Sequence, residues 1–154
     1  MLTIDQIVRV VIRRETSTKT VRDLQKIAIL SKHTRFAETF RRYQSTTAML
    51  ADGFLTTDFA YIAANRIFSQ DPQVKEIIVG KVVGGGTEAV NYVLDITKLQ
   101  SEAADWFFLI TDATDDADKL AIATYIETQT AMYVFSDHNT ASIVTGKQIG
   151  RAHV

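Results

Sequence analysis

The sequence predicts an α/β fold: a mainly parallel or mixed sheet of four to five strands flanked by helices, with an extended N-terminal strand or arm. Short, nearly continuous apolar runs alternate along the chain with longer segments of helical spacing. Strands that are buried on both faces have such runs, and the alternation favours right-handed βαβ crossovers. A β-branched run near the N-terminus stands apart from this pattern, behind a polar linker.

Length and composition bound the class of protein. The 154 residues suit one domain with a core of its own, and 46% hydrophobic with 23% charged residues argues against disorder. No apolar run approaches the roughly 18 residues that cross a bilayer, so we expect no membrane partner. Cys is absent, which excludes disulfides, thiolate metal sites and a Cys nucleophile. A cytoplasm is the simplest compartment for such a chain.

The chain divides into three parts. Residues 1–20 are expected to form an N-terminal strand or arm with its linker, and residues 21–140 the α/β domain. Residues 141–154 are expected to form an irregular tail, native or derived from a cloning vector, because "TGKQIGRAHV" has no periodicity.

The first half of the domain begins with an apolar strand over residues 26–31, "KIAILS". Residues 32–45 are basic and poorly patterned, which predicts a loop with at most a helical turn. The segment "STTAMLADG" predicts a short helix that ends at Gly53, since glycine tolerates positive φ.

A second helix is predicted between Thr56 or Thr57 as the N-cap and Asp71-Pro72 as the stop, with Asp58 in its first turn. Its apolar residues at helical spacing are Phe59, Ile62, Ala63 and Ile67. Further strands are predicted at residues 74–83, 106–111 and 131–137, and helices at 87–105 and 115–130.

An acidic turn joins the strand at 106–111 to the helix that follows. Its aspartates are Asp112, Asp115, Asp116 and Asp118. The favoured interpretation is a helix start, in which Thr114 or Asp115 caps the helix and the other acids oppose its dipole. The alternative is an Mg²⁺-dependent phosphoryl-processing enzyme that uses Asp112, Asp116 and Asp137, because open α/β sheets place ligands after their strands.

Catalytic motifs are missing from the sequence. "GKVVGGGTEA" places its lysine before the glycines, so it is no Walker loop, and no HExxH or GxSxG is present. We therefore expect a protein that is not an enzyme, with no catalytic residues, cofactor or metal.

Charge is unevenly distributed. Residues 1–45 hold ten Lys and Arg against four acids, whereas the remainder holds seven against fourteen. Such a split can indicate a nucleic-acid-binding face, or a chain whose basic part meets the acidic part of another copy, although a solvated face is the commonest interpretation of any charge run. Because no recognition-helix or RNP pattern accompanies the bases, nucleic-acid binding through the basic N-terminal third stays an alternative.

The run "IVRVVIRRE" predicts a terminal strand whose backbone groups need a partner. It can pair with its own sheet or add to the sheet edge of a neighbour. The predicted subunit contact consists of Ile7, Val8, Arg9, Val10, Val11, Ile12, Arg13 and Arg14.

Several of these segments together resemble the sheath proteins of contractile bacteriophage tails. The likeness runs from about Ile4 to Asp137, and includes "IVRVVIRRET", "IAILS", "ADWFFLITDATDDADKLAIATYIET" and "MYVFSD". Its most specific part is "YQSTTAMLADGFLTTDFAYIAANRIFSQDPQVKEIIVGKV". Sheath subunits are usually much longer, with further domains and a C-terminal arm, and "DLQKIAIL" replaces a glycine-containing pattern that often precedes the second strand.

The resemblance implies a structural subunit, or a fragment of one, from a phage or prophage. Such subunits are made in the bacterial host cytoplasm and polymerise in the virion tail into a contractile helical sheath around the tail tube protein. Their terminal arms exchange strands with neighbouring copies, and by position residues 7–14 would be the N-terminal arm.

Overall fold

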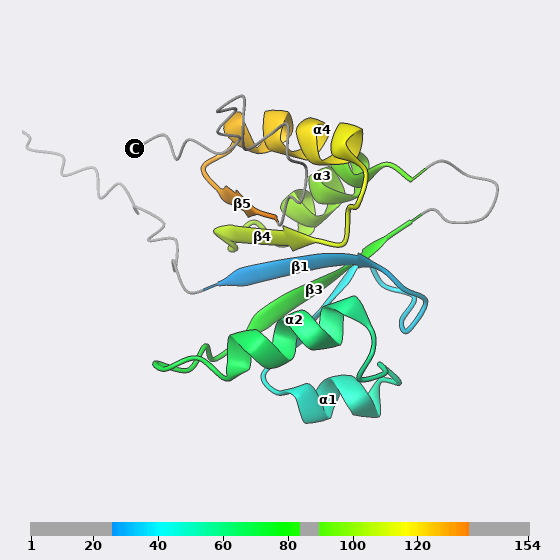
Figure 1. Ribbon diagram of the computed structural model, residues 1–154, viewed down its shortest axis with the longest axis vertical. Coiled ribbons are helices and arrows are strands. Elements are labelled where there is room, and N and C mark those ends of the chain that lie inside the picture. The colour runs from blue at the N-terminus through cyan, green and yellow to red at the C-terminus, as the bar shows by residue number, and fades with distance from the viewer. Residues whose placement is uncertain (1–25, 84–89, 136–154) are drawn as a thin grey trace, which may run out of the picture.

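The computed structural model describes residues 26–83 and 90–135, which form a five-stranded sheet with helices on both faces (Figure 1). The strands are β1 (Ile27–Lys32), β2 (Phe40–Tyr43), β3 (Ile77–Val82), β4 (Phe108–Thr111) and β5 (Met132–Val134). The helices are α1 (Thr46–Ala51), α2 (Phe59–Phe68), α3 (Tyr92–Glu102) and α4 (Asp116–Glu127). The predicted α/β class is confirmed.

The sheet is mixed, in the order β2-β3-β1-β4-β5. β1 lies at its centre, parallel to β3 on one side and to β4 on the other, and β5 continues the parallel part at one edge. Only β2, at the opposite edge, runs antiparallel. The central place of β1 explains its continuous apolar sequence, because Ala28, Ile29 and Leu30 alternate between two buried faces.

Helices α3 and α4 cover one face of the sheet, while α1 and α2 lie on the other (Figure 1). The first pair closes a core in which Trp106, Leu109 and Ile122 are fully buried. On the second face, Met49, Phe54 and Ala64 join side chains of β1 and β3 in a separate cluster.

Local signals set most helix ends. Ser45 caps α1 by accepting from Ala48 N–H, and Gly53 follows the helix with a φ of 87°, in the left-handed region that favours glycine. The N-cap of α2 is Asp58, not Thr56 or Thr57 as predicted. Asp58 binds Leu55 N–H and the Arg35 guanidinium, so its carboxylate fixes the chain ahead of the helix.

The prediction of a loop over residues 32–45 is wrong at its end, where β2 forms. Tyr43 is buried, whereas Arg41 pairs with Asp52 and Arg42 with Glu76, which lie further along the chain. Since β2 is an edge strand, its outward side chains can be charged, and its sequence lacks the apolar run of the central strands.

Several predictions concern residues outside the described part of the chain: the N-terminal strand at residues 7–14, Asp137 and the tail at 141–154. The predicted boundaries at residues 20 and 140 lie outside it as well. In the described part of the chain, no helix combines the length and apolarity that a bilayer crossing requires.

Candidate functional site

The acidic turn is built into the fold through Asp112. Its carboxylate accepts hydrogen bonds from Lys32 N–H at the end of β1 and from the Tyr92 hydroxyl of α3, each at 2.8 Å. Burial, and then the hydrogen bond to Asp112, raise the pKa of Tyr92 above its ordinary value. Asp112 therefore ties β4 to the central strand and to the helix behind it.

The remaining aspartates of the turn start a helix, as predicted. Asp115 is the N-cap of α4 and accepts from Ala117 N–H at 2.8 Å. Asp116 and Asp118 lie in the first turn, where carboxylates oppose the positive end of the helix dipole. Asp116 also pairs with Lys119 at 3.1 Å.

The alternative magnesium set is only partly described, because Asp137 lies outside the described residues. Its other two members, Asp112 and Asp116, already have protein partners. Across residues 26–83 and 90–135, no group of three His, Cys, Asp or Glu side chains is placed to hold a metal ion.

The basic part of the chain meets acidic residues of the same chain. Arg42 binds both Glu76 and Asp105 at 2.8 Å, and Lys26 also pairs with Asp105. Arg42 and then Lys26 hold the pKa of Asp105 well below its usual range. Four of the five Lys and Arg within residues 26–45 are in such pairs, so this part of the basic third is largely neutralised.

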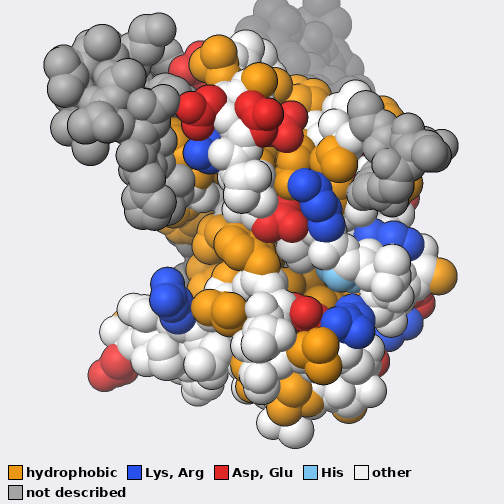
Figure 2. Space-filling model, turned by 45° about the vertical axis from the view of Figure 1, so that its right-hand side comes forward, with side chains coloured by type: hydrophobic (Ala, Val, Ile, Leu, Met, Phe, Trp, Pro, Cys, Tyr) orange, Lys and Arg blue, Asp and Glu red, His pale blue; other side chains and the backbone are white. Residues whose placement is uncertain are grey.

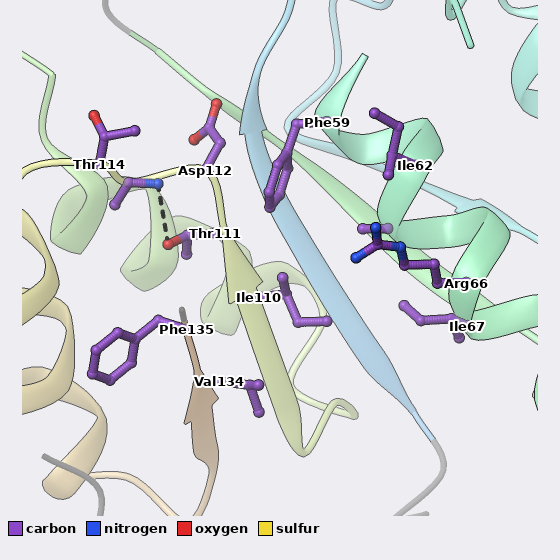
Figure 3. Close-up of a pocket in the computed structure, with 12 residues that line it drawn as sticks. Phe59, Ile62, Arg66, Ile67, Ile110, Thr111, Asp112, Thr114, Val134 and Phe135 are labelled. Atoms are coloured by element: carbon purple, nitrogen blue, oxygen red, sulfur yellow. Dashed lines mark hydrogen bonds between the residues drawn. The ribbon is translucent and has the colours of Figure 1, made fainter. Parts of the chain in front are cut away.

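An apolar groove lies between α2 and the two strands β4 and β5. Side chains of α2 face those of β4 and β5 across it, with β1 between them (Figure 3). The groove has a volume of about 470 Å³. Its apolar lining residues include Phe59, Ile62, Ile67, Ile110, Val134 and Phe135.

This groove exposes large apolar side chains to solvent. Phe59, Ile62 and Val134 are 39%, 42% and 45% exposed. Figure 2 shows hydrophobic side chains gathered across the middle of this face, with acidic side chains above them. Its polar rim includes Arg66 of α2 and Asp112.

The groove exists because α1 and α2 do not reach β5. Ile67 packs over β1 and β3 with Ile29 and Val79, but no described helix covers Val134 on the same face. β5 is also an edge strand, so the described residues give one side of its backbone no strand partner. An uncovered apolar face beside a free strand edge is a surface suited to another chain.

Sequence reasoning missed this groove although it named several of the residues that line it. Phe59 and Ile62 were expected on the apolar face of a helix together with Ile67. Ile67 is buried, while Phe59 and Ile62 are partly exposed at the groove. The breadth of the apolar arc on α2 is the signal that could have indicated a second contact surface.

No family model, curated protein or solved structure matches this chain.

Proposed function

We propose that this chain is a structural subunit, or part of one, that self-associates through its N-terminal strand, and that the acceptor is the groove and free edge of β5. The observation that carries the proposal is the open apolar face beside that edge, with Phe59, Ile62 and Val134 exposed. Covering these side chains removes apolar surface from water.

The sequence of residues 7–14 suits this acceptor. In an extended conformation Val8, Val10 and Ile12 share one face, which supplies apolar side chains to cover the groove. The arginines at 9 and 13 fall on the other face of such a strand. The acidic turn that starts α4 lies beside the groove, so its carboxylates would attract these arginines. Backbone pairing with β5 would supply affinity, and side-chain fit would fix the register.

The resemblance to contractile tail sheath proteins gives this association a context. In that context the chain would be a sheath subunit in the virion tail, with copies of itself and a tail tube protein as partners. Asp115 caps a helix and Asp112 holds β4 to β1. These structural roles of the carboxylates agree with a binding protein.

The proposal is tested by the mass of the chain in solution. The full chain, a variant lacking residues 1–15 and an Ile62→Asp variant are compared by light scattering over a concentration series. We expect the full chain to form oligomers and both variants to dissociate, since a charge at Ile62 must be desolvated in the contact.

Leu120→Asp is the matched control, because Leu120 is 56% exposed on α4, on the opposite face of the sheet. It should associate like the unchanged chain. A full chain that stays monomeric at high concentration contradicts the proposal, as does an Ile62→Asp variant that associates normally.

A further inference from the structure

The apolar groove beside β5 carries opposite charges at its two ends. Among the described residues that line it, Asp112 is the acid and Arg66 is the base. Asp112 follows β4 directly and lies with Phe59, the first residue of α2, towards the carboxyl ends of the strands (Figure 3). Arg66 lies in the last turn of α2, towards the amino ends (Figure 3). A strand that enters the groove therefore meets a negative end and a positive end.

Neither charge is neutralised within the described part of the chain, where neither Asp112 nor Arg66 makes an ion pair. Asp112 accepts hydrogen bonds from Lys32 N–H and from the Tyr92 hydroxyl, and both donors are neutral. The Lys32 ammonium lies on the other face of the sheet, 5.5 Å from the centroid of the Tyr92 ring. Both charges of the groove can therefore act on a partner.

The acidic turn that starts α4 adds to the negative end. Residues 112–119 hold four aspartates against one lysine, and Thr114 of this turn lines the groove. Clustered charge of one sign attracts the opposite charge of a partner and so orients it. Cationic side chains of an incoming strand are therefore expected at the carboxyl end of the sheet and not beside Arg66.

The N-terminal strand, residues 7–14, also carries its charge unevenly. In an extended conformation Val8, Val10, Ile12 and Arg14 share one face, so this face is apolar until its last residue. A strand parallel to β5 brings Arg14 to the acidic turn. An antiparallel strand brings Arg14 to the end where Arg66 lies, and the two like charges repel each other.

The register follows from the spacing of residues along the strands. Ile110 pairs with Val134 in the parallel β4–β5 ladder, and Asp112 comes two residues after Ile110. When Arg14 lies level with Asp112, Ile12 therefore falls beside Val134, and Val10 falls beside Met132. Met132 and Val134 point to the same face of the sheet, because they are two residues apart in one strand.

We infer that a neighbouring copy adds its N-terminal strand to β5 in the parallel direction, with Ile12 beside Val134 and Arg14 at the acidic turn. The inference rests on the proposed function, because it specifies how the same groove is filled. The added strand continues the parallel series of β3, β1, β4 and β5. Charge sets its direction, and the apolar side chains on one face set its register.

Disulfide cross-linking tests the direction, since the chain has no Cys of its own. One chain carries Met132→Cys or Val134→Cys, and a second chain of different mass carries Val8→Cys, Val10→Cys or Ile12→Cys. Each mixture is oxidised, and the covalent heterodimers are identified by their mass. We expect the highest yield for Val134 with Ile12 and for Met132 with Val10, because a disulfide requires adjacent Cβ atoms.

The order of the yields separates the possible failures. In a parallel pairing the best partner of Met132 lies two residues before that of Val134, and in an antiparallel pairing it lies two residues after it. The antiparallel order overturns the inference and leaves the proposed function in place. A parallel order in another register supports the direction and overturns the pairing of Ile12 with Val134. A chain that associates without any cross-link, or that stays monomeric, overturns the inference together with the acceptor at β5.

Charge reversal tests the direction without cysteines. Arg14→Glu should weaken association roughly tenfold, measured by light scattering over a concentration series, because it places a carboxylate at the acidic turn. Arg66→Glu should change the Kd by the same factor, within about twofold, whether or not the chain also carries Arg14→Glu, since the two side chains do not meet. Arg66 is exposed, so its variant should keep the fold. A tighter Kd from Arg66→Glu that Arg14→Glu abolishes shows that the two side chains face each other, and overturns the parallel direction.

Discussion

On the face covered by α3 and α4, Trp106, Leu109 and Ile122 have no solvent exposure, whereas on the opposite face the same sheet leaves Val134 45% exposed beside α2. The first face has two helices that span β3, β1 and β4. On the second face, α1 and α2 pack with side chains of β1, β2 and β3, and no described helix covers β5. Intrachain packing therefore covers one face of the sheet, whereas the other face leaves apolar side chains exposed in the described part of the chain.

The largest expected effect lies on the closed face. Trp106→Ala leaves a cavity among residues that are already close-packed, and should lower the free energy of unfolding by about 3–5 kcal/mol. Ile62→Ala on the open face should cost less than about 1 kcal/mol, because Ile62 is 42% exposed. Urea unfolding of both variants measures the difference. Equal losses would contradict the distinction between the two faces.

A smaller effect is expected at Asp112, where the closed face meets the carboxyl edge of the sheet. Asp112→Ala removes the acceptor for Lys32 N–H and for the buried Tyr92 hydroxyl, which should cost about 1–3 kcal/mol. Asp112→Asn keeps one acceptor oxygen and should lose less.

Magnesium separates this structural role from the alternative metal site. Millimolar Mg²⁺ and then a chelator should leave the Tm of the unchanged chain where it was, because a ligand stabilises only a state that binds it. A clear rise in Tm with Mg²⁺ that Asp112→Ala abolishes would revive the enzyme alternative.

The smallest expected effect lies at the amino end of the sheet, where Asp105 binds Arg42 and Lys26. Its folded pKa is lowered, so the stabilisation is present above the unfolded value of about 3.9 and is lost as the pH falls below it. The side chain is 39% exposed, so solvent screening should keep the effect below about 1 kcal/mol. An Asp105→Asn variant should show a shallower loss of stability in acid, measured by urea unfolding at a series of pH values.

The sequence alone predicts the elements in which neighbouring residues share one structural role. Ala28, Ile29 and Leu30 are apolar because both faces of β1 are buried, and Asp115 is a cap by residue type and position. β2 escaped prediction because Arg42 finds Glu76 and Asp105 only after the chain has folded. Such charge pairing over long separations leaves no local pattern.

The candidate site was less predictable for a similar reason. Phe59 and Ile67 belong to the same apolar pattern of α2, yet Phe59 is exposed at the groove and Ile67 is buried. Which strands α2 covers depends on where the sheet places β4 and β5, not on α2 itself.

The chain enters the described domain at β1, the strand that is paired along both sides. Tension on the segment ahead of Lys26 would run along the axis of β1, parallel to β3 and β4. Many backbone hydrogen bonds would then have to slide together, whereas a strand pulled from an edge opens them one by one. A pull on that segment would therefore load β1 in shear along both of its pairings.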